Sequence, residues 1–274
     1  MPTRPSLESR FPRPSVMGVV NVTPDSFSDG GINLHPETAV ATARRLLDEG
    51  AAIVDVGGES TRPGSDGVSA DEELRRVEPV LEALAGAPVS IDTSKAAVAR
   101  RALALGVELV NDVSALRADP ELAGVVADSG AYLCLMHMLG APRTMQDNPV
   151  YEDVVSDIKA FLEERLAFAI AAGVQEEHIC LDPGTGFGKT VQQNFELIRR
   201  LDELAAIGRP LVIGFSRKSS LVRIVGDPTA RTGSVAASLG AAISAYGRGA
   251  TLLRVHDVRE HVEALAVAKA VAEG

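Results

Sequence analysis

Eight short apolar runs recur along the 274-residue chain, and a longer segment of mixed polarity separates each run from the next. Each run has four to seven residues. The runs are nearly continuous in apolarity and rich in β-branched residues, as expected of strands buried on both faces of a parallel sheet. The predicted strands are residues 16–22, 51–56, 89–92, 107–110, 131–136, 179–182, 211–215 and 251–255. This repetition restricts the possible folds more than any other feature of the sequence.

The segments between these runs have the periodicity of amphipathic helices. Val154, Ile158 and Leu162, for example, recur every fourth residue and would share one helix face. Several segments end in a glycine shortly before the next strand, where helices often finish in a left-handed residue. These glycines are Gly50, Gly106, Gly130, Gly173, Gly208 and Gly249. The chain therefore repeats a regular strand–helix unit.

Eight such units without a long linker predict a single (β/α)8 TIM barrel, an α/β fold that takes roughly 250 residues. We expect the barrel domain to cover residues 16–274. Residues 1–15 carry arginines and prolines but no apolar core, and they are predicted to form a flexible leader. A doubly wound sheet is the alternative, because eight strands do not by themselves close a barrel. The polar loop after the first strand, in place of a Gly-x-Gly-x-x-Gly turn, favours the barrel.

Polar side chains end most of the predicted strands, among them Asn21, Asp92, Asn111, Asp182 and Arg254. In each of these cases the residue two positions earlier is small or apolar, as expected if it fills the barrel interior while the polar residue faces the mouth. Such residues could instead cap the following helices, a role that suits Asp and Asn. Because six of the eight strands end in this way, we favour a shared polar site at the mouth.

The residue types at this mouth predict a site with two parts. Four cations and a histidine gather there, a set that suits a phosphate or a carboxylate. They are Arg62, Arg217, Lys218, Arg254 and His256. Asp92, Asn111 and Asp182 offer acceptors and donors for the N–H-rich edge of a nitrogen heterocycle.

The charge balance of 27 Lys and Arg against 37 Asp and Glu gives a net charge of −10, which argues against a nucleic-acid or anionic-membrane binder. The acidic excess falls on predicted helices, as in Asp71, Glu72 and Glu73, which we expect to be solvated. No apolar run reaches the length of a membrane span. Cys134 and Cys180 are too few for a disulfide framework, so we expect buried thiols and a cytoplasmic protein. Three histidines, namely His35, His178 and His261, have no partners at metal-ligand spacing and are expected on the surface.

Motifs in the predicted loops resemble those of the dihydropteroate synthase family. Residues 21–31 (NVTPDSFSDGG) resemble its first signature, and residues 55–64 (DVGGESTRPG) resemble its second. Shorter motifs follow in the family's order at residues 90–93, 111–114, 136–138, 182–189, 216–218 and 254–257. The resemblance covers about residues 16–272, essentially the whole predicted barrel.

The resemblance implies an enzyme of folate synthesis, a target of sulfonamides. Such an enzyme joins 6-hydroxymethyl-7,8-dihydropterin pyrophosphate to p-aminobenzoate and releases 7,8-dihydropteroate and pyrophosphate. By this resemblance Asp92, Asn111 and Asp182 bind the pterin edge, and Arg254 stacks on the pterin face. The remaining pterin-pocket residues that it implies are Met136, Phe187, Gly214 and Lys218.

The family's other motif residues imply a pyrophosphate region and an aminobenzoate pocket. Asn21 would be a ligand of a Mg²⁺ cofactor, with Thr61 and His256 close to the pyrophosphate. The aminobenzoate pocket would be formed by Phe27, Arg62, Pro63 and Ser216.

The resemblance also implies that the C–O bond to pyrophosphate breaks before the amine attacks. Mg²⁺ and cationic side chains would neutralise the leaving group, and closed loops would keep water away from the positive pterin methylene. Asp29 in the first loop is our candidate to stabilise that positive charge. We count Asp29, Lys218, Arg254 and His256 as catalytic. No Ser/His/Asp hydrolase signature is present, in keeping with attack by the free amine.

Two alternative functions remain to be separated from the synthase. One is the methyltetrahydrofolate-binding barrel of corrinoid methyltransferases, which does not need the Ser216-Arg217-Lys218 motif or the two loop motifs. The other is a catalytically inactive homologue, which would be expected to lose loop residues such as Asp29 and Arg62. The family is usually homodimeric, and the Ala-rich residues 235–245 would permit close helix packing.

Overall fold

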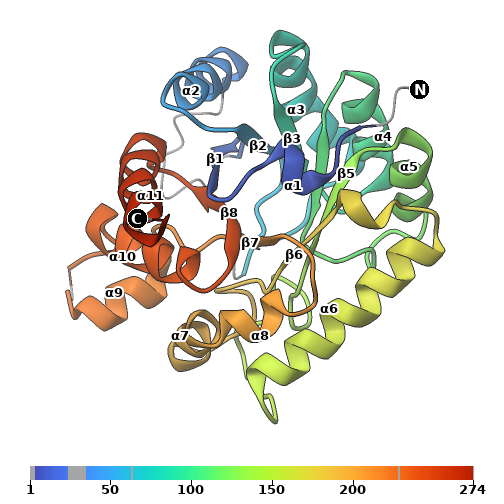
Figure 1. The fold of residues 1–274 in the computed structure, drawn as a ribbon. Helices are drawn as coiled ribbons and strands as arrows, with labels where there is room; N and C mark the ends of the chain where they lie inside the picture. Colours follow the sequence, from blue (N-terminus) through green and yellow to red (C-terminus); the bar gives the residue numbers. More distant parts are fainter. Residues whose placement is uncertain (1–3, 24–34, 63, 228, 274) are drawn as a thin grey trace.

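The structure is a computed structural model that describes residues 4–23, 35–62, 64–227 and 229–273. Eight parallel strands form a closed barrel in the order β1-β2-β3-β4-β5-β6-β7-β8, as Figure 1 shows. The strands are β1 (Ser15–Asn21), β2 (Ile53–Gly57), β3 (Val89–Asp92), β4 (Leu109–Asp112), β5 (Tyr132–Met136), β6 (Ile179–Asp182), β7 (Leu211–Ile213) and β8 (Ala250–Val255). The predicted TIM barrel is confirmed. Closure through the pairing of β1 with β8 excludes the doubly wound sheet.

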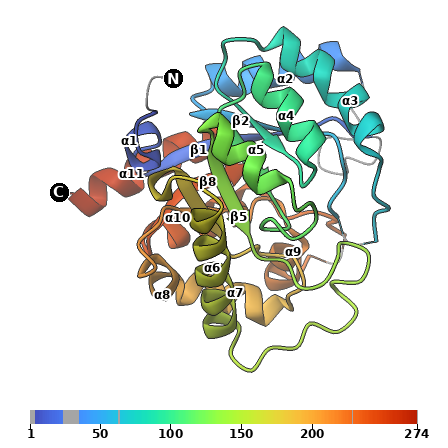
Figure 2. The same cartoon turned by 90° about the vertical axis from the view of Figure 1, so that its right-hand side faces the viewer.

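Helices surround the barrel and cover the outer faces of the strands (Figures 1 and 2). After a short N-terminal helix α1 (Leu7–Arg10), they are α2 (Pro36–Asp48), α3 (Ala70–Ala83), α4 (Ala96–Ala104), α5 (Leu122–Ser129), α6 (Val154–Ala171), η2 (Glu176–His178), α7 (Val191–Arg199), α8 (Leu201–Ala205), α9 (Ser219–Val225), α10 (Val235–Tyr246) and α11 (Val258–Glu273). All six predicted helix-ending glycines have positive φ, between 65° and 112°. This is the left-handed conformation that glycine adopts at little cost.

Alternation along the strands divides the core into two parts. One row of side chains packs outward against the helices, as Val16 and Val20 of β1 do. The other row fills the barrel interior with Met17, Ile53, Leu109, Cys134, Cys180, Val212 and Leu252. The two cysteines face each other in register on β5 and β6, and both are free and buried, as predicted.

The amino-terminal end of the barrel is closed by the chain's own N-terminal segment. Leu7 and Phe11 are fully buried and pack into the interior cluster. The Tyr132 hydroxyl donates to the Pro5 carbonyl at 2.9 Å, and the Arg10 guanidinium lies 2.8 Å from the Glu108 carboxylate. For residues 4–15, the prediction of a flexible leader was wrong. The apolar interior is open at this end and needs cover, which two large apolar side chains in the segment provide.

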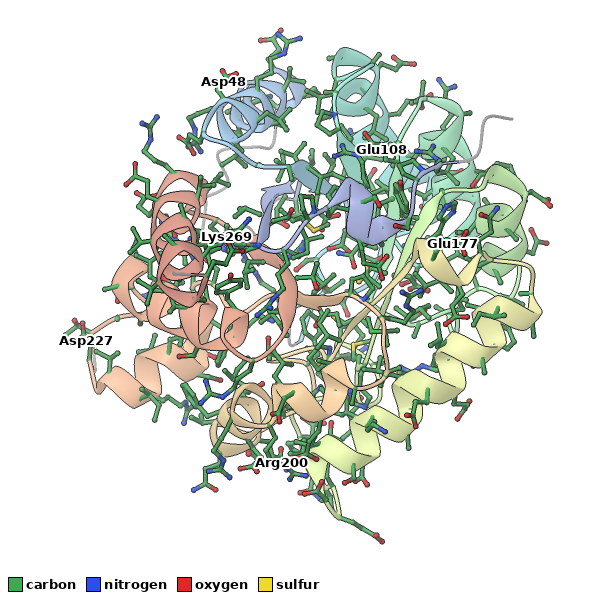
Figure 3. The ribbon with its side chains drawn as sticks, in the orientation of Figure 1. Asp48, Glu108, Glu177, Arg200, Asp227 and Lys269 are labelled. Atoms are coloured by element: carbon green, nitrogen blue, oxygen red, sulfur yellow. The ribbon has the colours of Figure 1, made fainter. Side chains whose placement is uncertain are left out.

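The helices also carry the charged surface. Figure 3 labels charged side chains on the outside of the barrel, among them Asp48 of α2 and Glu177 of η2, which are exposed. Glu73 is an exception, because its side chain is fully buried although it lies in an acidic helix segment. Within the described ranges, no helix combines the length and the apolar character required to cross a bilayer.

Candidate functional site

A buried carboxylate, Asp55 of β2, lies at the centre of the polar residues at the carboxyl ends of the strands. One of its oxygens accepts from the Ser90 hydroxyl at 2.7 Å. The other accepts from the Asn111 amide at 2.9 Å and from Arg254 Nε at 2.7 Å. Asp55 therefore joins strands β2, β3, β4 and β8.

Arg254 connects this cluster to Asp92 at the end of β3. Its Nη2 donates to Asp92 Oδ2 at 3.0 Å while its Nε remains on Asp55. Burial, together with the neighbouring Asp55 charge, raises the pKa of Asp92 to about 8, although Arg254 opposes this shift. Burial disfavours the charged form of Arg254, but Asp55 and Asp92 outweigh it and raise the pKa of the guanidinium. Asp92, Asn111 and Arg254 thus lie together, as the sequence predicted.

Asp182 and Lys218 form a second polar group beside the first. Asp182 accepts from the Gly184 amide at 2.6 Å, and burial raises its pKa. Lys218 Nζ donates to the Thr185 carbonyl and lies 4.7 Å from the centre of the Phe187 ring. Burial and Arg254 lower the pKa of Lys218 to about 8 against the opposing effect of Asp182. Lys218 therefore gives up its proton more readily than an exposed lysine does.

The loop after β6 requires glycine where it passes the neighbouring loop. Gly184 has φ +67°, and a Cβ there would lie 1.9 Å from the His137 carbonyl oxygen. A Cβ on Gly186 would meet the Lys218 side chain at 2.9 Å. Met136 pairs in register with Asp182, and Phe187 packs on the apolar cluster that contains Met136. The predicted pocket residues Met136 and Phe187 therefore border the Asp182 group.

His256 and Ser216 form a third group, at the ends of β8 and β7. His256 Nδ1 lies 3.3 Å from the Ser216 hydroxyl. Burial and the nearby positive charges of Arg254, Arg217 and Arg62 lower the pKa of His256 to about 3, although Asp257 opposes them. The imidazole is therefore neutral near pH 7. Arg62 is thus close enough for its positive charge to lower the pKa of His256.

Arg217 has an unusual backbone between Ser216 and Lys218. Its φ is +58°, which a non-glycine residue seldom adopts. Its guanidinium pairs with both oxygens of Asp257, with Nε at 2.8 Å from Oδ2, and its amide donates to the Ser238 hydroxyl at 3.0 Å. These contacts keep the strained residue in place between two predicted site residues.

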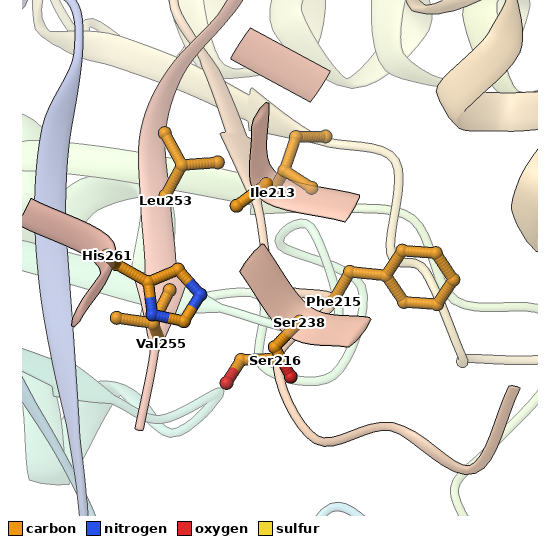
Figure 4. Close-up of a pocket in the computed structure, with 8 residues that line it drawn as sticks. Ile213, Phe215, Ser216, Ser238, Leu253, Val255 and His261 are labelled. Atoms are coloured by element: carbon orange, nitrogen blue, oxygen red, sulfur yellow. The ribbon is translucent and has the colours of Figure 1, made fainter. Parts of the chain in front are cut away.

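A small cavity lies in the barrel wall behind Ser216 (Figure 4). Its volume is about 10 Å³, enough for one water molecule and too small for a substrate. His261 lines it and is fully buried, with Nδ1 at 2.6 Å from the Asp257 carbonyl oxygen. His178 is also buried, at the opposite end of the barrel beneath Tyr132. The expectation that these two histidines lie on the surface was wrong, because the helices that carry them pack against the barrel.

The other predicted site residues lie around the mouth or outside the described residues. Asn21 ends β1, whose register partner there is Gly57, which in turn pairs with Asp92. Thr61 and Arg62 lie on the loop between β2 and α3 and are partly buried. The carbonyl of Gly214 accepts from the Thr185 hydroxyl at 2.9 Å. Phe27, Asp29 and Pro63 fall outside the described residues.

Sequence reasoning missed two residues of the site. The central acceptor Asp55 and its donor Ser90 were not among the predicted site residues, although they pair in register on β2 and β3. A signal existed, because an aspartate within an otherwise apolar strand, two positions from the strand end, must face the interior.

Known proteins match almost the whole chain. A family model described as pterin binding enzyme covers residues 17–256. The dihydropteroate synthase of Neisseria meningitidis serogroup B is 49% identical over 268 residues, which cover 94% of this chain and 93% of that protein. A Yersinia pestis dihydropteroate synthase, solved as a sulfonamide drug complex, has a TM-score of 0.91 at 43% identity and covers 96% of this chain and 95% of its own. A Xanthomonas albilineans dihydropteroate synthase with 4-aminobenzoic acid has a TM-score of 0.87 at 47% identity, with coverage of 96% and 94%.

Proposed function

The chain belongs to the dihydropteroate synthases, a family of pterin-binding enzymes, and we propose that its barrel mouth performs the family's condensation by a dissociative route. The substrates are 6-hydroxymethyl-7,8-dihydropterin pyrophosphate and p-aminobenzoate, and the products are 7,8-dihydropteroate and pyrophosphate. The observation that carries the proposal is the buried acceptor set of Asp55, Asp92 and Asn111 around Arg254.

The acceptor set suits the pyrimidine edge of a pterin. That edge presents N–H groups in a guanidine-like arrangement, which a carboxylate binds with two parallel hydrogen bonds. Asp92, Asn111 and Asp182 would bind this edge, and Asp55 would orient Asn111 and Arg254 beneath it. Lys218 would donate to a ring acceptor, while Met136, Phe187 and Gly214 border the ring. Arg254, half-buried across the mouth, would move from Asp92 to the face of the bound ring.

The positive part of the mouth suits the pyrophosphate. Asn21, Thr61 and His256 would lie along the leaving group, and the charges of Arg62 and Arg254 would neutralise the negative charge that develops on it. The C–O bond breaks with its electron pair passing to pyrophosphate. Neutral His256 can donate one hydrogen bond to a phosphate oxygen without a prior proton transfer.

The residues present fit a Mg²⁺ ion bound mainly through the substrate. Among the residues that the structure describes, no group of three or more His, Cys, Asp or Glu could hold a metal. Mg²⁺ commonly takes one or two protein oxygens and completes its shell with phosphates and water, so the Asn21 amide oxygen is a suitable ligand. When bound there, the ion would neutralise charge on the leaving pyrophosphate.

The second half of the reaction needs only an unprotonated amine. The p-aminobenzoate nitrogen attacks the positive pterin methylene, the new C–N bond forms, and the nitrogen loses its proton to the pyrophosphate that has just been released. Ser216 and Arg62, with Phe27 and Pro63, would hold the benzoate, and Asp29 would stabilise the positive methylene before attack. Low access of water at this stage prevents hydrolysis.

Pyrophosphate release by the purified protein tests this function. With Mg²⁺ present, we expect release and a coupled pteroate product only when pterin pyrophosphate and p-aminobenzoate are supplied together. Steady release without the amine, or no coupled product, would contradict the proposal. Calorimetric titration with pterin pyrophosphate distinguishes an active synthase from an inactive pterin-binding homologue, because the homologue would bind this substrate without forming product. Methyl transfer from methyltetrahydrofolate would instead support the corrinoid-dependent alternative.

We further propose that the protein is a cytoplasmic homodimer that associates through α10 and α11. Val267 and Val271 of α11 are 66% and 79% exposed, and Ile243 of α10 is 41% exposed. Exposed apolar residues on two adjoining helices are typical of a subunit interface. Sedimentation of the wild type should give a dimer, and Val267→Asp should shift it to a monomer. The buried free thiols agree with a reducing compartment.

A further inference from the structure

A partly buried lysine, Lys95, holds together the two loops that carry opposite halves of the site. It is the N-cap residue of α4, three positions after Asp92. Its Nζ lies 2.6 Å from Glu73 Oε2 on α3, and it also donates to Glu59 Oε2 at the start of the loop between β2 and α3. That loop carries Thr61 and Arg62.

Glu59 closes the loop on itself. While one carboxylate oxygen binds Lys95, the other accepts from the Val68 amide at 3.2 Å. Residues 59 and 68 are the two ends of the loop, so a single side chain ties its start to its finish. A Cβ on Gly67 would lie 2.9 Å from Glu59 Oε1, so the loop fits closely around this carboxylate.

Further contacts keep the closed loop compact and attach it to its neighbours. The Ser65 hydroxyl lies 2.6 Å from the Ser60 carbonyl oxygen and 2.7 Å from that of Arg62. Arg76 on α3 donates to the Gly58 carbonyl at 2.8 Å. The Gly64 amide donates to the Pro142 carbonyl at 3.1 Å. A loop held in this way would need little ordering when a ligand binds.

Glu73 explains why the lysine is required at this position. Its side chain is fully buried, and Oε1 has no hydrogen-bond partner. A carboxylate in such a place needs a cation, and Lys95 supplies it. The same ammonium has further N–H donors, and one of them donates to Glu59. A buried charge in the helix layer thereby fixes the position of a surface loop.

We propose that Lys95, with Glu59 and Glu73, is a positioning unit for the aminobenzoate half of the reaction. The inference rests on the proposed function. The unit touches neither substrate; it holds the loop of Thr61 and Arg62 at a set distance from the strand end that carries Asp92. A reactant that is misplaced by about 1 Å can lose about 100-fold in rate. A loop that holds p-aminobenzoate must therefore itself be held in position, and the unit does this.

Steady-state kinetics of Lys95→Met test this assignment. We expect the KM for p-aminobenzoate to rise about tenfold or more, because the loop samples positions away from the mouth. Affinity for 6-hydroxymethyl-7,8-dihydropterin, measured by calorimetry, should change by no more than about twofold, because this pterin lacks the pyrophosphate that Thr61 and Arg62 would contact and none of the residues of the unit lies in the acceptor set. An equal loss for this pterin and for p-aminobenzoate would overturn the proposal.

Two further variants separate positioning from simple loss of stability. Lys95→Met leaves Glu73 buried without a cation, so the variant should unfold more easily. The double variant Lys95→Met/Glu73→Gln removes that unpaired charge and should recover much of the stability. Its KM for p-aminobenzoate should remain high, because Glu59 is still unattached. If the KM returns to the wild-type value together with the stability, Lys95 is structural only. Glu59→Gln should raise the same KM with little loss of stability.

Arg101 offers a matched control on the same two helices. Its guanidinium joins α4 to Glu78 and Glu82 of α3 at 2.6 and 2.9 Å, as Lys95 joins two carboxylates, but it pairs with none of the described residues of the loop. Arg101→Met should leave the KM for p-aminobenzoate and the affinity for the pterin unchanged.

Hydrogen exchange gives a readout that does not depend on catalysis. Mass spectrometry of a peptide covering residues 58–68 should show exchange faster by roughly tenfold in Lys95→Met and Glu59→Gln. The peptide should be unaffected in Arg101→Met. Unchanged exchange in Lys95→Met would refute the positioning unit even if the wild type proved to have no synthase activity. Conversely, a wild type without activity would refute the proposed function and leave this result standing.

Discussion

The two ends of the barrel use the same strands for opposite purposes. At the amino end, Leu7 and Phe11 close the interior with apolar side chains that are fully buried. At the carboxyl end, the interior continues into Asp55, Asp92 and Arg254, where carboxylates share one guanidinium. The first arrangement lowers the free energy of the fold by removing apolar surface from water. The second holds charges away from water, which costs stability and prepares acceptors for a ligand.

The comparison teaches where a substitution should affect folding and where it should affect binding. Changes at the amino end should reduce the free energy of unfolding and leave kinetic constants alone. Changes at the carboxyl end should reduce affinity and leave stability equal or higher. Four substitutions or conditions test this separation.

The largest effect is expected for Asp92→Asn at the carboxyl end. An amide cannot offer the two carboxylate oxygens that would accept from the pterin edge, so kcat/KM should fall by roughly 1000-fold, about 4 kcal/mol of transition-state stabilisation. The melting temperature should stay equal or rise, because one of two mutually repelling carboxylates is removed. Pteroate assays and thermal denaturation measure the two effects. Wild-type activity in this variant would contradict the role of Asp92, and Glu177→Gln on the surface serves as its control.

The next effect is expected for Phe11→Ala at the amino end. Truncation of a fully buried aromatic side chain should lower the free energy of unfolding by about 3–5 kcal/mol. The KM values of folded protein should not change, because the site lies at the other end of the strands. Urea denaturation measures the loss, and Phe168→Ala, at a side chain that is 42% exposed, should cost far less. A large change in KM would show that the ends are coupled.

A dependence of stability on pH is also expected to arise at the carboxyl end, from Asp92. The pKa of Asp92 is raised to about 8 by burial and Asp55, although Arg254 opposes the shift, so the folded state binds this proton more tightly than the unfolded state. Its contribution to stability is therefore complete below about pH 4, where the unfolded side chain also binds the proton, and is lost as the pH rises through 8. The stability difference between wild type and Asp92→Asn should shift by a few kcal/mol between pH 4 and pH 8, in favour of the variant at high pH. A difference that does not vary with pH would contradict this assignment.

The smallest effect is expected for Arg10→Ala. The pair with Glu108 is partly exposed, at 29% and 21%, so its loss should cost about 0.5–1 kcal/mol at most. Chemical denaturation at low and high salt measures it, and the difference should shrink at high salt. Activity should be unchanged. A change larger than that of Phe11→Ala would mean that charge, rather than apolar cover, closes the amino end.

Much of the fold could be predicted from the sequence because the relevant signals are local. The apolar runs placed every strand to within two residues of its observed bounds, and the glycines marked six helix ends. Alternation along the strands also brought Asp92, Asn111 and Arg254 to one mouth. The loop motifs pointed to the family without any structure.

Other features escaped prediction because they depend on residues distant in the sequence. Leu7 and Phe11 are buried only because the barrel presents an open apolar end to them. Glu73 looks like part of an acidic helix surface, yet it is buried against Lys95, 22 positions later. His261 is buried because α11 packs on the barrel wall.

The sequence by itself determined the repeating strand–helix unit, the polar strand ends and the family. These depend on periodicity and on residue type at fixed spacing, which are properties of a short stretch of chain. Only the tertiary structure decided that Asp55 is the common acceptor, that the N-terminal segment closes the barrel, and that Lys95 joins two loops. The first of these depends on closure, because pairing β1 with β8 brings Arg254 within 2.7 Å of Asp55, 199 positions earlier. No local pattern records which of many charged residues will meet when a sheet closes on itself.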